Sequence, residues 1–191
     1  IKSVENTKRD ISESTIRSNV CSIASVPARL IQKPPTKHAG ENVMKGPLEG
    51  IRILDLTQVQ AGPSSTQLLA WLGAEVIKVE EPEVGDRTRR ERSTDQNKDS
   101  HYFMIFNSNK RSICLNLKTE RGKELFLALV QQSDVIYENY GPGTMERFGL
   151  DYKALQQANP SIVYATIKGF GTYGPYSNLR SFEHIAQAMA G

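Results

Sequence analysis

The sequence predicts an α/β fold with a doubly wound, Rossmann-like parallel sheet, and three observations carry that prediction. Apolar runs of strand length alternate with stretches of helical length along most of the chain. The isoleucines and leucines of the first run, residues 51–57, suit a strand that is covered on both faces. Small residues, Ala61-Gly62-Pro63-Ser64-Ser65, then follow where the next helix must begin.

The first strand-helix-strand unit occupies residues 51–80. After the strand at 51–57 we expect a helix over about 62–72, which Gly73 can end in a left-handed conformation. A second strand follows at 74–80, and the crossover between the two strands should be right-handed. The helix carries its leucines on one face, and these are Leu68, Leu69 and Leu72.

The next segment, residues 81–109, is polar and interrupts the alternation, so we expect a long excursion over the sheet. Its arginines have two interpretations, a solvated loop or a phosphate clamp that closes over a ligand. Composition alone favours the solvated loop. The arginines are Arg87, Arg89, Arg90 and Arg92.

The rest of the chain resumes the alternation and ends in a helix. Thr119 stands where it can cap a helix, and a glycine-rich loop at 169–175 follows the last strand. The predicted strands are 112–117, 134–139 and 162–167; the predicted helices are about 119–132, 153–157 and from Phe182 onward, with a turn at Pro142-Gly143.

Three predicted strands end at one rim of the sheet, which is where α/β proteins bind phosphate-bearing ligands. These ends are Gln60-Ala61-Gly62, residues 138–141 and residues 168–171. The dinucleotide fingerprint is missing, so spacing alone favours an ordinary tight turn equally. For each of five cations near the rim taken singly, a surface ion pair is the favoured role, but their joint placement beside one rim also suits phosphate; they are Lys110, Arg111, Lys118, Arg147 and Arg180.

The net charge differs between the N-terminal residues 1–46 and the rest of the chain. Residues 1–46 carry a net charge of +4 against +3 for the whole chain, so the remainder is close to neutral. A nearly neutral folded part argues against nucleic acid as a partner. Residues 1–46 show no sustained period and predict a disordered leader, whose arginines and serines suit a mitochondrial transit segment. Its four acidic residues argue against that interpretation, and the cytoplasm is the alternative location.

Composition also excludes several classes of site. No apolar run has the length of a membrane span, so we expect no membrane association. Two isolated cysteines argue against a disulfide framework and favour a reducing compartment. The three histidines are scattered along the chain, so we expect no metal site.

Several motifs follow one another along residues 47–191. They are Leu54-Asp55-Leu56-Thr57 with Gln60-Ala61-Gly62-Pro63, Leu72-Gly73-Ala74-Glu75-Val76-Ile77-Lys78-Val79-Glu80, Asn107 with Asn109-Lys110-Arg111-Ser112-Ile113, Asp134-Val135 with Glu138-Asn139, Pro142-Gly143 with Arg147, and Lys168-Gly169-Phe170-Gly171. In these motifs the sequence resembles the class III (CaiB/BaiF-type) coenzyme A transferases, and within them the succinyl-CoA:glutarate CoA-transferases most closely. The resemblance makes residues 47–191 a Rossmann-like, CoA-binding large domain that is incomplete at its C-terminus.

The resemblance implies transfer of coenzyme A (CoA) from an acyl-CoA such as succinyl-CoA to a free carboxylic acid such as glutarate. In this family an aspartate attacks the thioester, and we expect that aspartate beyond Gly191, so the chain alone should be inactive. Gln60 and Glu183 would have supporting catalytic roles. The implied CoA contacts are Gln60, Ala61, Leu115, Asn116, Leu117, Lys118, Asn139, Tyr140, Gly141, Arg147, Arg180, Ser181, Phe182 and Glu183.

The resemblance further implies that CoA esters are substrates, that no cofactor is permanently bound, and that the intact protein is an interlocked homodimer. Glu81 departs from the family, since some relatives have an arginine there that packs against the adenine.

Two alternatives stay open. The α-methylacyl-CoA racemases share this fold, but they carry a histidine where this chain has Phe182 and typically an arginine where it has Gly141, so both positions favour a transferase. A non-catalytic CoA-ester-binding protein is the other alternative. A nucleotide-dependent oxidoreductase is disfavoured by the missing dinucleotide fingerprint.

Overall fold

The sheet is parallel throughout and doubly wound, as predicted. The computed structural model describes residues 46–91 and 98–191, and its five strands are ordered β3-β2-β1-β4-β5. The first described strand, β1, lies in the middle of the sheet; the chain then winds outward through β2 and β3, and β4 and β5 follow on the other side of β1. The strands are β1 (Arg52–Leu56), β2 (Glu75–Glu80), β3 (Arg111–Cys114), β4 (Val135–Glu138) and β5 (Val163–Thr166).

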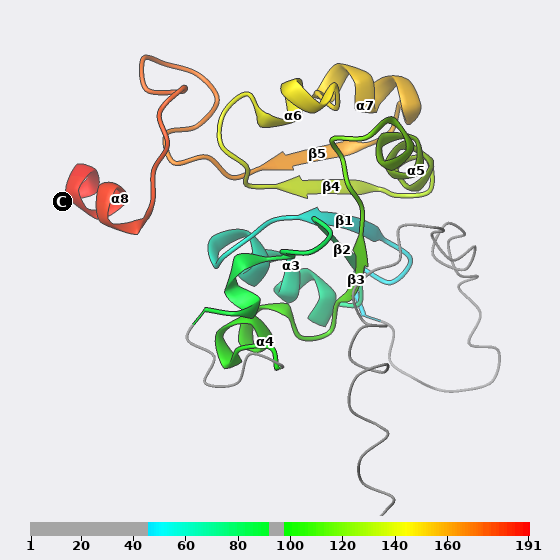
Figure 1. Ribbon diagram of the computed structural model, residues 1–191, viewed down its shortest axis with the longest axis horizontal. Coiled ribbons are helices and arrows are strands. Elements are labelled where there is room, and N and C mark those ends of the chain that lie inside the picture. The colour runs from blue at the N-terminus through cyan, green and yellow to red at the C-terminus, as the bar shows by residue number, and fades with distance from the viewer. Residues whose placement is uncertain (1–45, 92–97) are drawn as a thin grey trace, which may run out of the picture.

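Helices cover both faces of this sheet (Figure 1). On one side lie α5, α6 and α7, and on the other lie α3 and α4. The helices are α3 (Ala61–Trp71), α4 (His101–Asn107), α5 (Glu120–Val130), α6 (Thr144–Phe148), α7 (Tyr152–Ala158) and α8 (Glu183–Ala190), with a 3₁₀ turn η1 (Arg87–Arg89).

The alternation of side chains along the strands gives each face its own core. On the face covered by α5 and α7, strand residues such as Leu54 and Ile136 pack with Phe126 and Leu129, all fully buried. On the other face a smaller cluster surrounds Ile53. Its other buried members are Ala70, Ala74 and Val76.

Over residues 46–91 and 98–191 most predicted elements are present, and the helices α4 and α6 were not predicted. Thr119 caps α5 as expected, since its hydroxyl accepts the amide of Gly122 at 3.1 Å. The excursion over 81–109 contains α4, which begins because the Ser100 hydroxyl accepts the amide of Phe103. The five-residue α6 follows the predicted turn at Pro142-Gly143. Both helices are too short to show a helical period in the sequence.

Of the predicted leucine face of α3, Leu69 packs against the core cluster around Ile53, but Leu68 and Leu72 do not. Leu68 and Leu72 are 55% and 45% exposed, whereas Thr66 and Gln67 are buried. Polar bonds cause this orientation, because the Thr66 hydroxyl donates to a strand carboxylate and the Gln67 amide donates to the main chain of α4. Gly73, with φ of 102°, ends the helix in the predicted left-handed conformation.

The predicted leader, residues 1–46, lies outside the described residues apart from Gly46. Within the part of the chain that the structure describes, no helix has the length and apolar character of a membrane span.

Candidate functional site

The carboxyl ends of β1, β4 and β5 lie side by side, so the predicted rim exists. The winding reverses between β1 and β4, which pair in parallel from Ile53↔Val135 to Leu56↔Glu138. Open parallel sheets bind ligands at this switch point. Two turns form it: residues 57–60, which lead into α3, and residues 139–143, which lead into α6.

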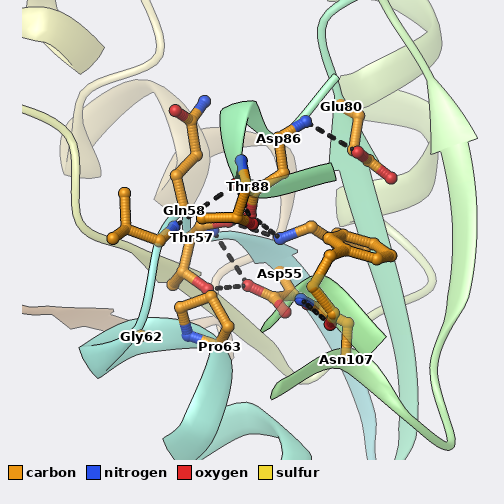
Figure 2. Close-up of polar contacts among 12 residues, drawn as sticks. Asp55, Thr57, Gln58, Gly62, Pro63, Glu80, Asp86, Thr88 and Asn107 are labelled. Atoms are coloured by element: carbon orange, nitrogen blue, oxygen red, sulfur yellow. Dashed lines mark hydrogen bonds and ion pairs between the residues drawn. The ribbon is translucent and has the colours of Figure 1, made fainter. Parts of the chain in front are cut away.

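A buried carboxylate supports the first turn from below. Asp55, on β1, is fully buried, and its Oδ1 accepts the amide of Thr57 at 2.9 Å and the Thr57 hydroxyl (Figure 2). Its Oδ2 accepts the Thr66 hydroxyl at 2.7 Å and Lys110 Nζ at 3.0 Å. Lys110 Nζ also donates to the Pro63 carbonyl and to Asn107 Oδ1. One carboxylate thereby joins β1, α3 and the start of β3.

A second buried ion pair supports the same turn from the β2 side. Lys78 Nζ donates to the Thr57 carbonyl at 2.7 Å and lies 3.0 Å from Asp86 Oδ2. The other Asp86 oxygen accepts the amide of Val59 at 3.4 Å and both donors of Thr88. Val59 has φ of 70°, which is a strained conformation for a β-branched residue. The Asp86 contact helps to hold that strain immediately before Gln60.

Asn139 closes the switch point itself. Its Oδ1 accepts the amide of Gln58 and its Nδ2 donates to the Gln58 carbonyl, both at 2.8 Å. The side chain thus joins the turn after β4 to the turn after β1. Because this amide is used within the protein, a ligand would meet the main chain around Asn139 rather than the Nδ2 and Oδ1 already bonded.

Glu80 anchors the segment that carries Asp86. Burial alone would raise the pKa of Glu80, but hydrogen bonds from Arg89 and Ser112, the Arg89 charge and the Asp86 amide lower that pKa to about 2. Arg89 also pairs with Asp99 and stacks on the Phe103 ring, with the guanidinium carbon 3.8 Å from the ring centroid. Arg89 therefore holds η1 and α4 together. It neither belongs to a solvated loop nor acts as a phosphate clamp.

Acid should weaken the fold through Glu80. A carboxylate whose folded pKa is lowered stabilises the protein above its ordinary pKa of 4.5, and that stabilisation is lost as the pH falls from about 4.5 towards 2. The contribution is about 3 kcal/mol. Urea unfolding at pH 3 and pH 7 should therefore differ less in Glu80→Gln than in the parent. Glu120→Gln, in an 86% exposed side chain, should keep the parental difference, and an unchanged pH dependence in Glu80→Gln would contradict the assignment.

The start of α3 is open to the rim. Its cap residue Gln60 makes no side-chain capping bond, and Pro63 has no N–H. The first amides of a helix have no acceptor within the helix, and here they belong to Ala61, which is exposed, and Gly62, which is buried. The Gln60 side chain lies across the rim, where its Oε1 accepts the Tyr102 hydroxyl at 3.0 Å. Gln60 is therefore held by α4, which sequence reasoning did not anticipate.

The predicted contact segment Leu115–Lys118 lies between β3 and α5. Its position depends on Gly122, because a Cβ there would stand 1.9 Å from the Asn116 carbonyl oxygen. Leu115 and Leu117 are buried in the core, so only Asn116 and Lys118 offer side chains to a ligand. Lys118 Nζ pairs with Glu81 at 2.6 Å, and both side chains are largely exposed.

The structure brings Arg180 to the turn after β4 but leaves α8 apart from the sheet (Figure 1). Arg180 Nε lies 3.0 Å from the position that a Cβ on Gly141 would occupy, and Ser181 packs on Gly169. Phe182 is 66% exposed, and Glu183 accepts only the Gln187 amide of its own helix among the described residues. Glu183 and Gln60 are not brought into contact. Arg147, on α6, is exposed and bonds to Thr144.

A second buried network supports the turn after β4. Glu138 is 1% exposed and accepts the Tyr140 amide, the Tyr164 and Thr166 hydroxyls and Lys168 Nζ. Burial, followed by the Glu138 charge, raises the pKa of both Tyr140 and Tyr164, so both phenols stay protonated. Lys168 therefore ties the glycine-rich loop to the rim.

A cleft of about 170 Å³ lies beside this network. It is smaller than the roughly 300 Å³ of a typical ligand pocket, so it could take only part of a CoA ester or a short acid. None of the implied CoA contacts lines it. The lining is Glu138, Pro142, Gly143, Met145, Glu146, Tyr164, Thr166, Lys168, Gly171, Thr172, Ser177 and Asn178. Over the described residues, no group of His, Cys, Asp and Glu side chains is arranged to hold a metal ion.

Two of the five predicted phosphate cations are used elsewhere. The Lys110 side chain is 2% exposed and bound to Asp55, so it forms the expected ion pair, buried rather than on the surface, and does not face a ligand; burial also lowers its pKa, against the Asp55 charge. Arg111 pairs with Glu75 at the amino end of β2. Sequence reasoning missed the supporting residues Lys78 and Asp86, because a lysine inside an apolar strand gives no signal of its partner across the sheet.

Comparisons with known proteins agree with this geometry. Residues 48–191 match CoA-transferase family III. The chain belongs to that family. The formyl-CoA:oxalate CoA-transferase of Streptomyces avermitilis is 56% identical over 144 residues, which are 75% of this chain and 35% of that protein. The enzyme of the same name from Escherichia coli O6:H1 is 47% identical over 148 residues, or 78% and 36% of the two chains.

A solved structure shows the same fold. The CaiB/BaiF family protein from Brucella suis superposes with a TM-score of 0.71 at 39% identity, over 76% of this chain and 39% of that one. The chain spans about a third of the length of the curated family III relatives it matches.

Proposed function

We propose that the protein carrying this chain transfers CoA from an acyl-CoA donor to a free carboxylic acid. The observation that carries the proposal is the open start of α3 at the switch point, held from below by Asp55 and Asp86, in a chain that belongs to CoA-transferase family III. CoA carries phosphates that need amides and cations, and a rigid turn offers main-chain amides without reorganisation.

The chemistry expected of this chain is binding and orientation. The main-chain amides of Ala61 and Gly62 can donate to an anionic or carbonyl oxygen, and the Gln60 amide, held by Tyr102, can orient the thioester. Lys118, Arg147 and Arg180 are exposed enough to meet phosphates. The nucleophilic carboxylate that the family uses is proposed to come from elsewhere in the protein.

The finer substrate proposal is succinyl-CoA as donor and glutarate as acceptor, because the motifs along residues 47–191 resemble those of succinyl-CoA:glutarate CoA-transferases. The relatives named above carry the name formyl-CoA:oxalate CoA-transferase, so formyl-CoA and oxalate are the competing pair. We also propose a homodimer in the mitochondrion, on the resemblance and on the arginines and serines of the leader.

A family III racemase is the alternative, and one contact argues against it. The racemases typically carry an arginine at the Gly141 position, but here the space next to Gly141 is occupied by Arg180. Incubating the intact protein with each donor and acceptor, and with a 2-methylacyl-CoA in deuterated water, separates the two activities. CoA exchange without deuterium uptake supports the proposal, and deuterium uptake without CoA exchange overturns it.

The phosphate contacts can be tested by binding. Replacing both Lys118 and Arg147 with alanine should cost about 1.5–3 kcal/mol per lost charge-assisted contact, which is at least tenfold in affinity. Calorimetry with succinyl-CoA measures the loss. The matched control is Lys123→Ala with Lys153→Ala, which removes two positive charges from α5 and α7. Unchanged affinity in Lys118→Ala/Arg147→Ala would show that CoA does not use this rim.

A further inference from the structure

One ion pair holds both main-chain groups of Tyr140. The Glu138 carboxylate accepts the Tyr140 amide at 2.8 Å, and Lys168 Nζ donates to the Tyr140 carbonyl at 2.6 Å. The two side chains also pair with each other at 2.8 Å, and they are 1% and 13% exposed. Removing either partner would therefore release one end of this peptide segment and leave the other charge nearly buried.

The direction of the next amide follows from peptide geometry. A trans peptide is planar, with its C=O and N–H pointing in opposite directions. Since the Tyr140 carbonyl points to Lys168, the N–H of Gly141 points away from the ion pair. That N–H has no hydrogen-bond partner among the described residues, although Gly141 is half-buried. The Gly141 N–H is therefore a hydrogen-bond donor that can take an acceptor from a ligand.

A cation lies next to this donor. Arg180 Nε is 3.0 Å from the place where a Cβ of residue 141 would stand, so only glycine leaves room for the guanidinium there. An amide N–H beside a guanidinium is an arrangement that suits an anionic oxygen. The exposed guanidinium of Arg180 can move to meet one, whereas the Gly141 peptide cannot rotate while Lys168 holds it.

We infer that the Glu138–Lys168 ion pair is a positioning device for CoA binding, which fixes the Tyr140–Gly141 peptide so that the Gly141 N–H donates to an oxygen of the CoA ester. The inference rests on the proposed function. In this role Glu138 and Lys168 act through the main chain of Tyr140, to which both are bonded. Lys168 thereby couples the glycine-rich loop to the turn after β4.

The test compares three variants of the intact protein with the parent. Lys168→Met should weaken succinyl-CoA binding about tenfold and raise KM for the donor by a similar factor, while kcat changes less. Lys168→Arg can still donate to the Tyr140 carbonyl and should recover part of the loss. Glu138→Gln/Lys168→Met leaves no unpaired buried charge and should fold, yet should bind as poorly as Lys168→Met, because the carbonyl remains unheld.

A direct readout follows the Gly141 amide itself. In the parent labelled with ¹⁵N-glycine, the Gly141 resonance should shift on addition of succinyl-CoA, and in the double variant that shift should be much smaller. Lys153→Met, on α7, is the matched control and should behave as the parent. Parental affinity in the folded double variant would overturn the inference while the proposed function stands. A parent that binds no CoA ester would overturn both.

Discussion

Replacing Asp55 with alanine should lower the free energy of unfolding by about 3–5 kcal/mol, which is the largest stability effect we expect of one substitution. The change removes the acceptor of four hydrogen bonds and leaves the Lys110 ammonium, 2% exposed, without its carboxylate. An unpaired buried charge costs far more than the pair contributes, because its desolvation is no longer offset. Guanidinium unfolding of the parent and variant measures the loss.

A double variant identifies the cause. In Asp55→Leu/Lys110→Met the buried charge is absent, so much of the lost stability should return. Asp151→Ala is a useful comparison, since that carboxylate accepts one amide at the start of α7 and should cost only about 1 kcal/mol. Equal losses in Asp55→Ala and Asp151→Ala would contradict a central role for the Asp55 network.

The sequence predicts the sheet, the rim and the order of most elements because these depend on local patterns. Runs such as 51–57 and 134–139 read as strands whatever their partners are, and parallel crossovers then place their carboxyl ends together. Gly73 and Thr119 also signal their roles locally, as a left-handed helix end and a helix cap. The family resemblance then names the residues that should meet CoA.

The errors concern partners that are distant in sequence. Lys110 resembles a ligand-binding cation until Asp55, 55 residues away, is placed beside it. Leu68 and Leu72 of α3 resemble core residues until Thr66 is bound to that same Asp55 and turns the helix. Period and composition cannot show such contacts, because a side chain's partner across a sheet depends on the tertiary fold.

The buried polar residues explain how a strained turn persists at the rim. Val59 has an unfavourable φ, and its neighbours Thr57 and Gln58 are held by Asp55, Lys78 and Asn139. A residue in such a conformation costs roughly 1–3 kcal/mol and survives only when its surroundings over-determine it. The turn is thereby rigid before any ligand arrives, which lowers the cost of binding.

Replacing Gly62 with alanine should disrupt both the fold and the rim. A Cβ at Gly62 would lie 2.3 Å from Cβ of Thr57, whose side chain is fixed by Asp55, so α3 must move away from β1. Alanine normally stabilises a helix relative to glycine by up to about 1 kcal/mol, so a loss of stability would reverse the usual sign. We expect a loss of about 3 kcal/mol.

The same displacement should weaken binding of succinyl-CoA by the intact protein more than a hundredfold, because the amides of residues 61 and 62 leave the switch point. Ser64→Ala is the matched control in the same helical turn, since the Ser64 hydroxyl donates to the Ala61 carbonyl and has no other side-chain bond within the described residues. Calorimetry measures the affinity of both variants for succinyl-CoA, and thermal unfolding measures their stability. If Gly62→Ala is as stable as Ser64→Ala and binds equally well, then the close approach of α3 to Thr57 neither limits the fold nor sets the geometry of the rim.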